Sequence, residues 1–455
     1  MKYASTRGAA PVLTFDDVLV TGLARDGGLY VPESWPALPA TTSGRYADVA
    51  REVMWPYVEG AIERSAFAAL VDDAYAGFDH PDVCPLVDLG DGTWLLELFH
   101  GPTLAFKDVA LQLVGRLFDH VLAQRGERLT IVVATSGDTG SAAIEACRDR
   151  SALDIVVLFP HGRVSEVQRR QMTTVDLPNV RCVAVDGTFD DCQDLAKATF
   201  NDADFRDRHR LSAMNSINWA RVLPQVTYYV TAAAALGGGP VAFAVPTGNF
   251  GNVLAGWVAA AMGLPVEHLV VASNRNDILT RWITSGVMEV AEVHPTTSPS
   301  MDIQVSSNVE RLLFELYHRD GVAVAAHMAA FRAMGRLDIG AERLALLRSW
   351  FAGARIDEAA AAEVMRATYE RTGILVDPHT AVGLGAAATL RTDRPVVAIA
   401  TASPAKFPDA VEAATGVRPP LPPRLADLLD RRERYVRAPN DVAALKELVA
   451  AASRS

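Results

Sequence analysis

The chain has 455 residues, and half of them are hydrophobic, which is enough for two or three domains and excludes disorder of the chain as a whole. Its formal net charge of −11 argues against nucleic acid as the main partner, because nucleic-acid-binding surfaces are basic. No stretch of about 20 apolar residues is free of charge, proline or asparagine, so no membrane span is expected.

Residues 1–95 are predicted to form a mixed N-terminal domain. Apolar positions indicate helix over much of 45–76, with a break at Pro56, because proline cannot donate the backbone hydrogen bond that a helix interior requires. Residues 94–99 (Trp-Leu-Leu-Glu-Leu-Phe) are predicted to form a strand that leads into the next segment.

The nine residues 100–108 (His-Gly-Pro-Thr-Leu-Ala-Phe-Lys-Asp) place Lys107 at the beginning of a predicted helix. Apolar residues follow it at spacings of three and four, as on a buried helix face. Burial lowers the pKa of a lysine, and a neutral amine can attack a carbonyl, so Lys107 is a candidate Schiff-base lysine. The alternative is an ordinary helix-end lysine whose amine reaches water.

Strands and helices alternate over 96–220, which predicts an α/β domain with a parallel sheet and crossover helices. The apolar strand at 129–134 runs into the polar turn 135–141 (Thr-Ser-Gly-Asp-Thr-Gly-Ser) and then into a helix.

A second α/β domain is predicted over 221–415, with a helical insertion at about 320–372, and a C-terminal helical segment follows over 416–455. Its strand at 241–246 enters the loop 247–252 (Thr-Gly-Asn-Phe-Gly-Asn), ahead of a helix of small residues. Glycines let backbone N–H groups approach an anion, and a helix N-terminus favours negative charge. A third apolar strand, 395–400, ends at Thr401.

Three strands therefore end in loops rich in glycine or hydroxyl groups, and in open α/β sheets ligands bind at the carboxyl ends of strands. With the lysine, these loops suggest pyridoxal 5'-phosphate (PLP) as cofactor. No Walker A spacing and no G-x-S-x-G elbow occurs. The four cysteines include no C-x-x-C pair, so no metal site is predicted and free thiols in a reducing cytoplasm are expected.

Six segments, in order, resemble those of threonine synthases, which are PLP enzymes of fold type II. The segment 298–308 is similar to a stretch typical of the longer microbial and fungal branch of that family. The resemblance implies two open, twisted, mainly parallel α/β domains plus the N-terminal section. The other five segments are the opening (1–8 with 22–32), 103–107, 135–140, 215–221 and 247–252.

The resemblance also implies roles for individual residues. Lys107 would attach the cofactor, Thr401 would face its pyridine nitrogen, and Asp138 would take a place where many relatives carry Asn near the phenolic oxygen. The cofactor phosphate would be held, largely through backbone N–H groups, by Gly248, Asn249, Phe250, Gly251 and Asn252. Ser136, Asp138 and Thr139 lie on the loop that would meet the substrate carboxylate, and Asn215 and Arg221 would bind the substrate phosphate. Ser403 stands where this branch often has His.

The expected activity is the conversion of O-phospho-L-homoserine and water to L-threonine and phosphate, by γ-elimination and β-addition. A serine/threonine dehydratase or related PLP lyase is the alternative within the fold, and a non-catalytic ligand-binding homologue is the alternative outside enzymes. The predicted partner is the small-molecule substrate, with neither nucleic acid nor membrane.

Overall fold

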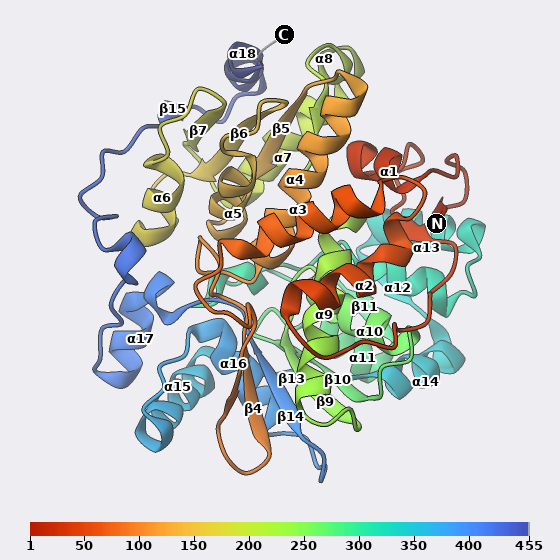
Figure 1. The fold of residues 1–455 in the computed structure, drawn as a ribbon, viewed down its shortest axis with the longest axis vertical. Coiled ribbons are helices and arrows are strands. Elements are labelled where there is room, and N and C mark those ends of the chain that lie inside the picture. The colour runs from red at the N-terminus through yellow and green to blue at the C-terminus, as the bar shows by residue number, and fades with distance from the viewer. Residues whose placement is uncertain (454–455) are drawn as a thin grey trace.

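Two sheets with helices on both faces form the frame of the molecule, in a computed structural model that describes residues 1–453 (Figure 1). The last two residues of the predicted C-terminal segment, 416–455, lie outside this part. The six-stranded sheet has the order β13 (Phe351–Arg355), β10 (Val266–Ser273), β9 (Val241–Pro246), β14 (Val396–Ala400), β4 (Thr93–Glu97) and β3 (Leu86–Asp88). The five-stranded sheet has the order β15 (Val436–Ala438), β7 (Val180–Val185), β6 (Leu153–Pro160), β5 (Leu129–Ala134) and β8 (Leu211–Ser212).

All neighbouring strands in these sheets are parallel except β3, which is antiparallel to β4. The fold class predicted from the sequence, α/β with two mainly parallel sheets, is thus confirmed. The chain does not complete one sheet before starting the other. The strand that precedes the Lys107 segment, β4, lies in the six-stranded sheet beside β14, and β15 near the C-terminus joins the five-stranded sheet beside β7.

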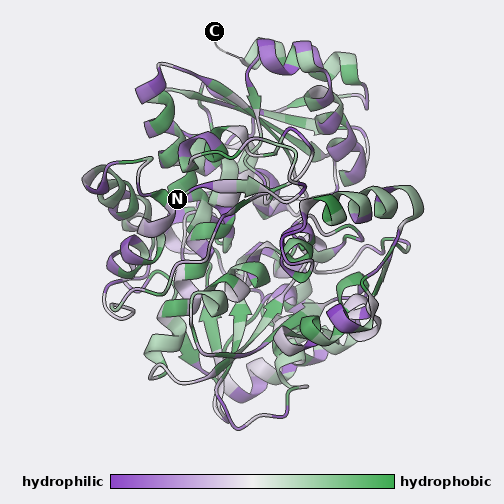
Figure 2. Cartoon of the chain, turned by 90° about the vertical axis from the view of Figure 1, so that its right-hand side faces the viewer, coloured by the Kyte–Doolittle hydropathy of each residue, from purple (hydrophilic) through white to green (hydrophobic). Residues whose placement is uncertain are grey.

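Each sheet is apolar on both faces, as parallel sheets between helices are. In β9, Phe243 and Val245 belong to the large central core, whereas Ala242 and Ala244 belong to the core under the outer helices. The strands of both sheets are largely hydrophobic in Figure 2. The alternation follows from the period of two in a strand, since successive side chains point to opposite faces.

Five helices form the central layer that joins the two halves. They are α2 (Tyr46–Val58), α3 (Arg64–Ala76), α4 (Lys107–Arg125), α9 (Trp219–Ala235) and α10 (Gly251–Ala261). The outer face of the five-stranded sheet is covered by α7 (Phe189–Asn201) and α18 (Val442–Ala452), and that of the six-stranded sheet by α15 (Glu358–Thr372) and α16 (Pro378–Ala387).

The other helices are α1 (Phe15–Thr21), α5 (Asp138–Cys147), α6 (Glu166–Thr173), α8 (Ala203–Arg208), α11 (Ile278–Ser285), α12 (Val309–Leu316), α13 (Gly321–Met334), α14 (Gly340–Trp350) and α17 (Pro408–Thr415), with 3-10 turns η1 (Pro299–Met301), η2 (Pro404–Lys406) and η3 (Pro423–Leu425). Two small antiparallel sheets pair β1 (Tyr3–Ser5) with β2 (Tyr30–Pro32) and β11 (Val287–Glu289) with β12 (Arg336–Asp338).

The N-terminal section packs against the central layer around one side chain. Trp219, the first residue of α9, is fully buried and contacts the rings of Tyr3, Trp35 and Tyr57. Asn218, just before it, donates a side-chain hydrogen bond to the carbonyl of Leu19 at 2.8 Å. The start of α9 is therefore held by residues from the beginning of the chain.

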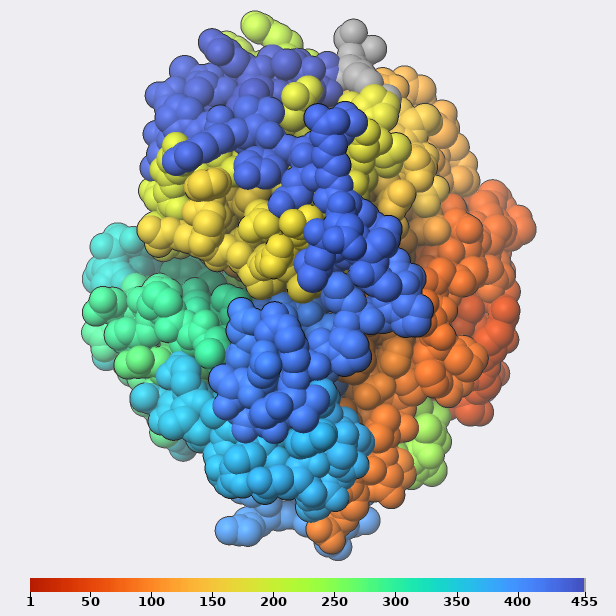
Figure 3. Space-filling view, turned by 90° about the vertical axis from the view of Figure 1, so that its left-hand side faces the viewer, coloured from red at the N-terminus to blue at the C-terminus, as the bar shows by residue number. Residues whose placement is uncertain are grey.

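Two regions predicted as helical also contain strands. In the insertion at 320–372, β13 adds an edge strand beside β10. Gly353 allows α11 to lie close to β13, since a Cβ on Gly353 would lie 3.0 Å from the Thr280 Cα. In the segment 416–455, β15 pairs with β7. Strands β13 and β15 are short, and each is hydrogen-bonded to a strand that is distant in the sequence. Local helix propensity cannot predict such pairing. Figure 3 shows the chain beyond residue 400 running along one face, from α17 toward the five-stranded sheet.

Close packing of α4 against α5 depends on a glycine. A Cβ on Gly115 would collide with the carbonyl oxygen of Ala146 at the end of α5. Alanine normally stabilises a helix interior by about 1 kcal/mol relative to glycine. Here we expect Gly115→Ala to lower the free energy of unfolding by about 1–3 kcal/mol, because the helices must separate. Chemical denaturation checks this, with Gly77→Ala as control, since a Cβ at Gly77 meets nothing within 4 Å. Equal stability of the Gly115 variant and the wild type would contradict it.

None of the helices in residues 1–453 is both long enough and apolar enough to cross a membrane.

Candidate functional site

Lys107 lies where the carboxyl ends of the two sheets face each other. The segment before it is bonded to the loop after β14: the Phe106 N–H donates to the Thr401 carbonyl at 2.8 Å, and the Ser403 N–H donates to the Leu104 carbonyl at 3.0 Å. Ala105 and Ala402 form an isolated bridge. These bonds fix the start of α4 against the end of β14, so Lys107 and Thr401 lie on adjoining segments.

The side chain of Lys107 is buried, with 8% of the residue exposed. Its amine donates to Asp138 Oδ2 at 3.3 Å and lies 4.9 Å from the centre of the Phe106 ring. Burial lowers the pKa of this amine, and the charge of Lys406 lowers it further, against the opposing attraction of Asp138. The helix-end alternative, with an amine reaching water, is thereby excluded.

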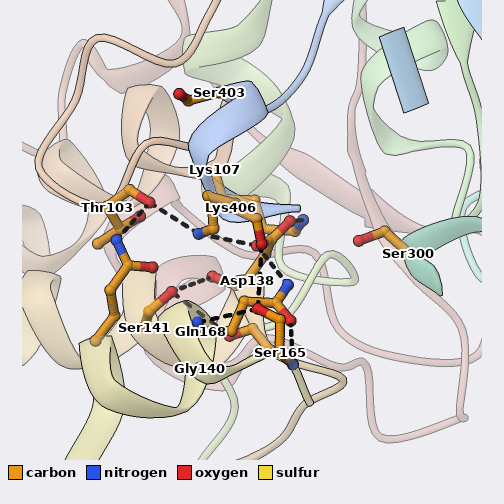
Figure 4. Close-up of polar contacts among 12 residues, drawn as sticks. Thr103, Lys107, Asp138, Gly140, Ser141, Ser165, Gln168, Ser300, Ser403 and Lys406 are labelled. Atoms are coloured by element: carbon orange, nitrogen blue, oxygen red, sulfur yellow. Dashed lines mark hydrogen bonds and ion pairs between the residues drawn. The ribbon is translucent and has the colours of Figure 1, made fainter. Parts of the chain in front are cut away.

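Asp138 opens α5 at the end of β5, and its carboxylate lies between two lysines (Figure 4). Oδ1 accepts from the Lys406 amine at 2.9 Å and from Gln168 Nε2 at 2.9 Å. Burial would raise the pKa of this carboxyl, but the charges of Lys406 and Lys107 and the bond from Gln168 outweigh it and hold the pKa far below its usual range. Asp138 is therefore ionised.

Lys406 was missed by sequence reasoning, although a signal was present. It follows Ser403-Pro404-Ala405 and precedes Phe407, so it is an apolar-flanked lysine after a strand end, as Lys107 is. Lys406 has no exposed surface, and its amine also donates to the Thr103 carbonyl at 2.8 Å. The Ser403 hydroxyl caps η2 by accepting from the Ala405 N–H, and Ser403 is buried.

The glycine loop after β9 forms a cradle at the N-terminus of α10. Phe250 adopts the left-handed conformation, with φ 64°, and turns the chain into the helix. Gly248 approaches the 298–301 segment so closely that a Cβ would lie 2.5 Å from the Ser300 carbonyl oxygen. The first N–H groups of a helix have no partner within it, so they are available to an anion. The loop therefore fits the phosphate of PLP.

Two outer bonds hold this cradle. The Ser306 hydroxyl donates to the Gly248 carbonyl at 2.8 Å, and the Asn308 amide donates to the Asn249 carbonyl at 3.0 Å. The side-chain oxygen of Asn252 accepts from the hydroxyls of Tyr228 and Tyr229, each at 2.7 Å, while its amide nitrogen is buried without a hydrogen-bond partner. Its place in the core was not readable from the sequence.

His379 supports the cradle from the six-stranded sheet. It is buried at the start of α16, where Nδ1 lies 2.7 Å from Asp377 Oδ2, and Nε2 accepts from the Ser300 N–H at 3.3 Å. The ring of His379 therefore bridges Asp377 and the backbone of Ser300. His379 thus shapes the site by hydrogen bonding.

Arg221 is a buried cation without a carboxylate partner. It is 4% exposed, and one guanidinium nitrogen donates to the Met214 carbonyl at 3.0 Å, while Nε has no hydrogen-bond partner. In the described chain, residues 1–453, Arg221 forms no ion pair with a side chain. Burial lowers its pKa to about 10, and its charge lowers the pKa of Lys107. An unpaired buried guanidinium is costly, and an anion would relieve that cost.

The remaining predicted residues are more open. Asn215 is exposed, and its side-chain oxygen accepts from the Ile217 N–H at 3.2 Å in the turn before α9. Ser136 and Thr139 are half-buried on the loop that the Thr135 hydroxyl shapes, by accepting from the N–H groups of Gly137 and Gly140 at 2.9 Å.

Three family models match the chain: "Threonine synthase N terminus" over residues 2–75, "Pyridoxal-phosphate dependent enzyme" over 85–340 and "Threonine synthase, C-terminal" over 380–449. The chain is 50% identical to a threonine synthase of Pseudomonas aeruginosa over 465 residues, covering 99% of this chain and 98% of that one. It is 39% identical to the threonine synthase of Saccharomyces cerevisiae, covering 90% and 88%.

Solved structures give the same result. The PLP-bound threonine synthase of Brucella melitensis is 51% identical and superposes with a TM-score of 0.97 over the full length of both chains. The Escherichia coli threonine synthase superposes with a TM-score of 0.85 at 29% identity over 99% of each chain. A tomato threonine deaminase, 12% identical with a TM-score of 0.52, shares the fold alone.

Proposed function

The chain belongs to the threonine synthase family, and we infer that it is a PLP-dependent lyase that converts O-phospho-L-homoserine to L-threonine with release of phosphate. The observation that carries this function at the site is a buried lysine with two separate anion-binding groups nearby in the fold. One is the glycine cradle at the start of α10, and the other is the unpaired guanidinium of Arg221. A reaction on a phosphorylated substrate with a phosphorylated cofactor requires two such places.

We propose that Lys107 attaches PLP and that the loop 248–252 holds the cofactor phosphate through its backbone. When bound, PLP supplies the electron sink that allows a proton to leave carbon next to the substrate nitrogen. Thr401 follows β14, its carbonyl accepts from the Phe106 N–H, and its hydroxyl, in place of a carboxylate, would meet the pyridine nitrogen of bound PLP. Asp138 lies at the end of the site near Lys107, where its carboxylate accepts hydrogen bonds from the amines of Lys107 and Lys406.

The chain's own groups then have distinct tasks. Burial lowers the pKa of Lys107 and so favours the uncharged amine, which would take a proton from carbon and return it later. We propose that Arg221 and Asn215 bind the substrate phosphate, because a planar guanidinium pairs with two phosphate oxygens at once. Ser136, Thr139 and the N–H groups at the start of α5 are proposed to receive the substrate carboxylate.

Product identification tests this function. The purified enzyme given O-phospho-L-homoserine should release inorganic phosphate and form L-threonine in equal amounts, measured by a phosphate assay and chiral chromatography. A dehydratase would instead release ammonia from threonine or serine and would need no phosphate on its substrate. Ammonia release without threonine formation would overturn the proposal.

We expect Gly248→Ala to weaken cofactor binding by about 10- to 150-fold, the equivalent of one lost charge-assisted hydrogen bond of about 1.5–3 kcal/mol. The added Cβ would lie 2.5 Å from the Ser300 carbonyl oxygen, so the cradle must open. Titration of cofactor-free protein with PLP measures the change, and Gly77→Ala serves as the control. If Gly248→Ala binds PLP as the wild type does, the cradle is not the phosphate site.

We also propose a cytoplasmic location. The four cysteines are buried free thiols, as expected in a reducing compartment.

A further inference from the structure

Three ionisable groups meet at the lysine end of the site, and only one of them is an acid. The carboxylate of Asp138 contacts the Lys107 amine at 3.3 Å through Oδ2 and the Lys406 amine at 2.9 Å through Oδ1 (Figure 4). All three residues are buried, and Lys406 has no exposed surface at all. One carboxylate cannot balance two ammonium ions away from water, so one of the two amines is better accommodated without charge.

The contacts show which amine keeps its proton. Lys406 has two oxygen acceptors at short distance, Asp138 Oδ1 at 2.9 Å and the Thr103 carbonyl at 2.8 Å. Lys107 has one acceptor, at 3.3 Å. Ammonium hydrogens that are buried need oxygen partners, so the better-supplied amine is the charged one.

The position of Lys406 is itself fixed. Its carbonyl accepts from the Ser165 hydroxyl at 3.1 Å, which joins η2 to the start of α6. From the same helix, Gln168 donates to Asp138 Oδ1 at 2.9 Å and Gln171 donates to the Thr103 carbonyl at 3.0 Å. Both acceptors of Lys406 are thus bound a second time by α6, and the pair is rigid.

We propose that Lys406 is a positioning residue of the reaction: its ammonium is the permanent counter-ion of Asp138, which leaves the Lys107 amine uncharged and free to leave the carboxylate. The proposal rests on the proposed role of Lys107. When the Lys107 nitrogen leaves Asp138, the carboxylate still accepts hydrogen bonds from Lys406 and Gln168. Its buried negative charge is therefore not left unpaired. The lowered pKa of Lys107 agrees with this arrangement.

The charged groups around Lys107 come from several elements. Asp138 comes from α5, Lys406 from η2 and Arg221 from α9, and the last two both lower the pKa of Lys107. Asp108, its neighbour on α4, is bound by the Thr103 hydroxyl and N–H. Loss of the charge on Lys406 therefore leaves Asp138 with Gln168 and a single ion-pair partner, Lys107, and the Lys107 amine should hold its proton to higher pH.

The test follows the amine directly. The full-length chain, freed of cofactor, is mixed with PLP at a series of pH values, and the rate of appearance of the bound-cofactor absorbance band is recorded. In Lys406→Met we expect the pH midpoint of this rate to rise by about one unit, so that below the midpoint attachment is about tenfold slower. Lys406→Arg, which keeps the charge, should restore most of the wild-type profile.

A matched control and a second variant complete the design. Lys446→Met removes another lysine–aspartate pair, with Asp202, from α18, and should leave the profile unchanged. Lys406→Gln retains a donor for the Thr103 carbonyl without the charge, so it carries the same test if the methionine variant does not fold. An unchanged midpoint in a folded, uncharged variant would overturn the proposal.

An Asp138→Asn background separates the two ways in which Lys406 can act. Without the carboxylate, Lys406→Met should move the midpoint by much less than in the wild-type background, because only direct repulsion between the amines is lost. Equal shifts in both backgrounds would show that Asp138 is not the intermediary and would reject the proposal.

Failure of the proposed function would look different. After borohydride reduction of the wild-type protein, peptide mass analysis should locate the cofactor on Lys107. A cofactor found on another lysine would refute the proposed role of Lys107 itself. A cofactor on Lys107 with identical pH profiles would refute only the role of Lys406.

Discussion

Replacing Lys107 by alanine should abolish turnover of O-phospho-L-homoserine, by at least about 10⁴-fold in kcat, because both the attachment point and the proton carrier are lost. The absorbance band of the bound cofactor should disappear as well. The variant should still fold, since Asp138 keeps its contacts with Lys406 and Gln168. Absorbance spectra, circular dichroism and phosphate release measure these three properties.

The control for this change is Lys197→Ala. Lys197 forms an exposed pair with Asp194 on α7, and its replacement should alter neither spectrum nor rate. A Lys107→Ala variant that retained the band and the turnover would mean that another lysine carries the chemistry.

Replacing Arg221 by alanine should lower kcat/KM for O-phospho-L-homoserine by about 10- to 150-fold, which corresponds to the about 1.5–3 kcal/mol of a charged hydrogen bond. The bound-cofactor band should persist, because the cradle at α10 is a different anion site. Competitive inhibition by inorganic phosphate should weaken in parallel. Steady-state kinetics and a PLP titration on the same preparation separate the two effects.

Two further variants show whether the effect comes from charge. Arg221→Lys keeps the positive charge but not the paired geometry, and should recover part of the loss. Arg64→Ala removes an exposed arginine paired with Glu52 and should have no effect. If Arg221→Ala reduced PLP affinity as much as substrate use, the assignment of separate phosphate sites would be wrong.

Local patterns in the sequence were sufficient for the main frame of the site. The apolar spacing after Lys107 and the strand-to-glycine pattern before Gly248 each specify one element and its end, and parallel sheets bring such ends together. The resemblance to a family then supplied residues that local pattern cannot rank, such as Arg221, whose burial with an unbonded Nε becomes visible only in the fold.

What the sequence did not reveal depends on contacts between distant segments. Lys406 is far from Lys107 along the chain, and the bonds between 104–106 and 401–403, together with the contact of the Lys406 amine with the Thr103 carbonyl, bring the two amines to one carboxylate. The side-chain oxygen of Asn252 is held by the hydroxyls of two tyrosines of α9. The short strands β13 and β15 exist because a sheet edge was available to each.

The packing of Trp219 links the beginning of the chain to the proposed binding site of the substrate phosphate. Arg221 lies two residues further along the first turn of the same helix, so the aromatic side chains that pack against the indole also hold the turn from which the guanidinium extends. The cofactor cradle has its own supports in Ser306, Asn308 and His379. An enzyme trimmed at its start would accordingly retain its coenzyme while losing its hold on the phosphorylated amino acid.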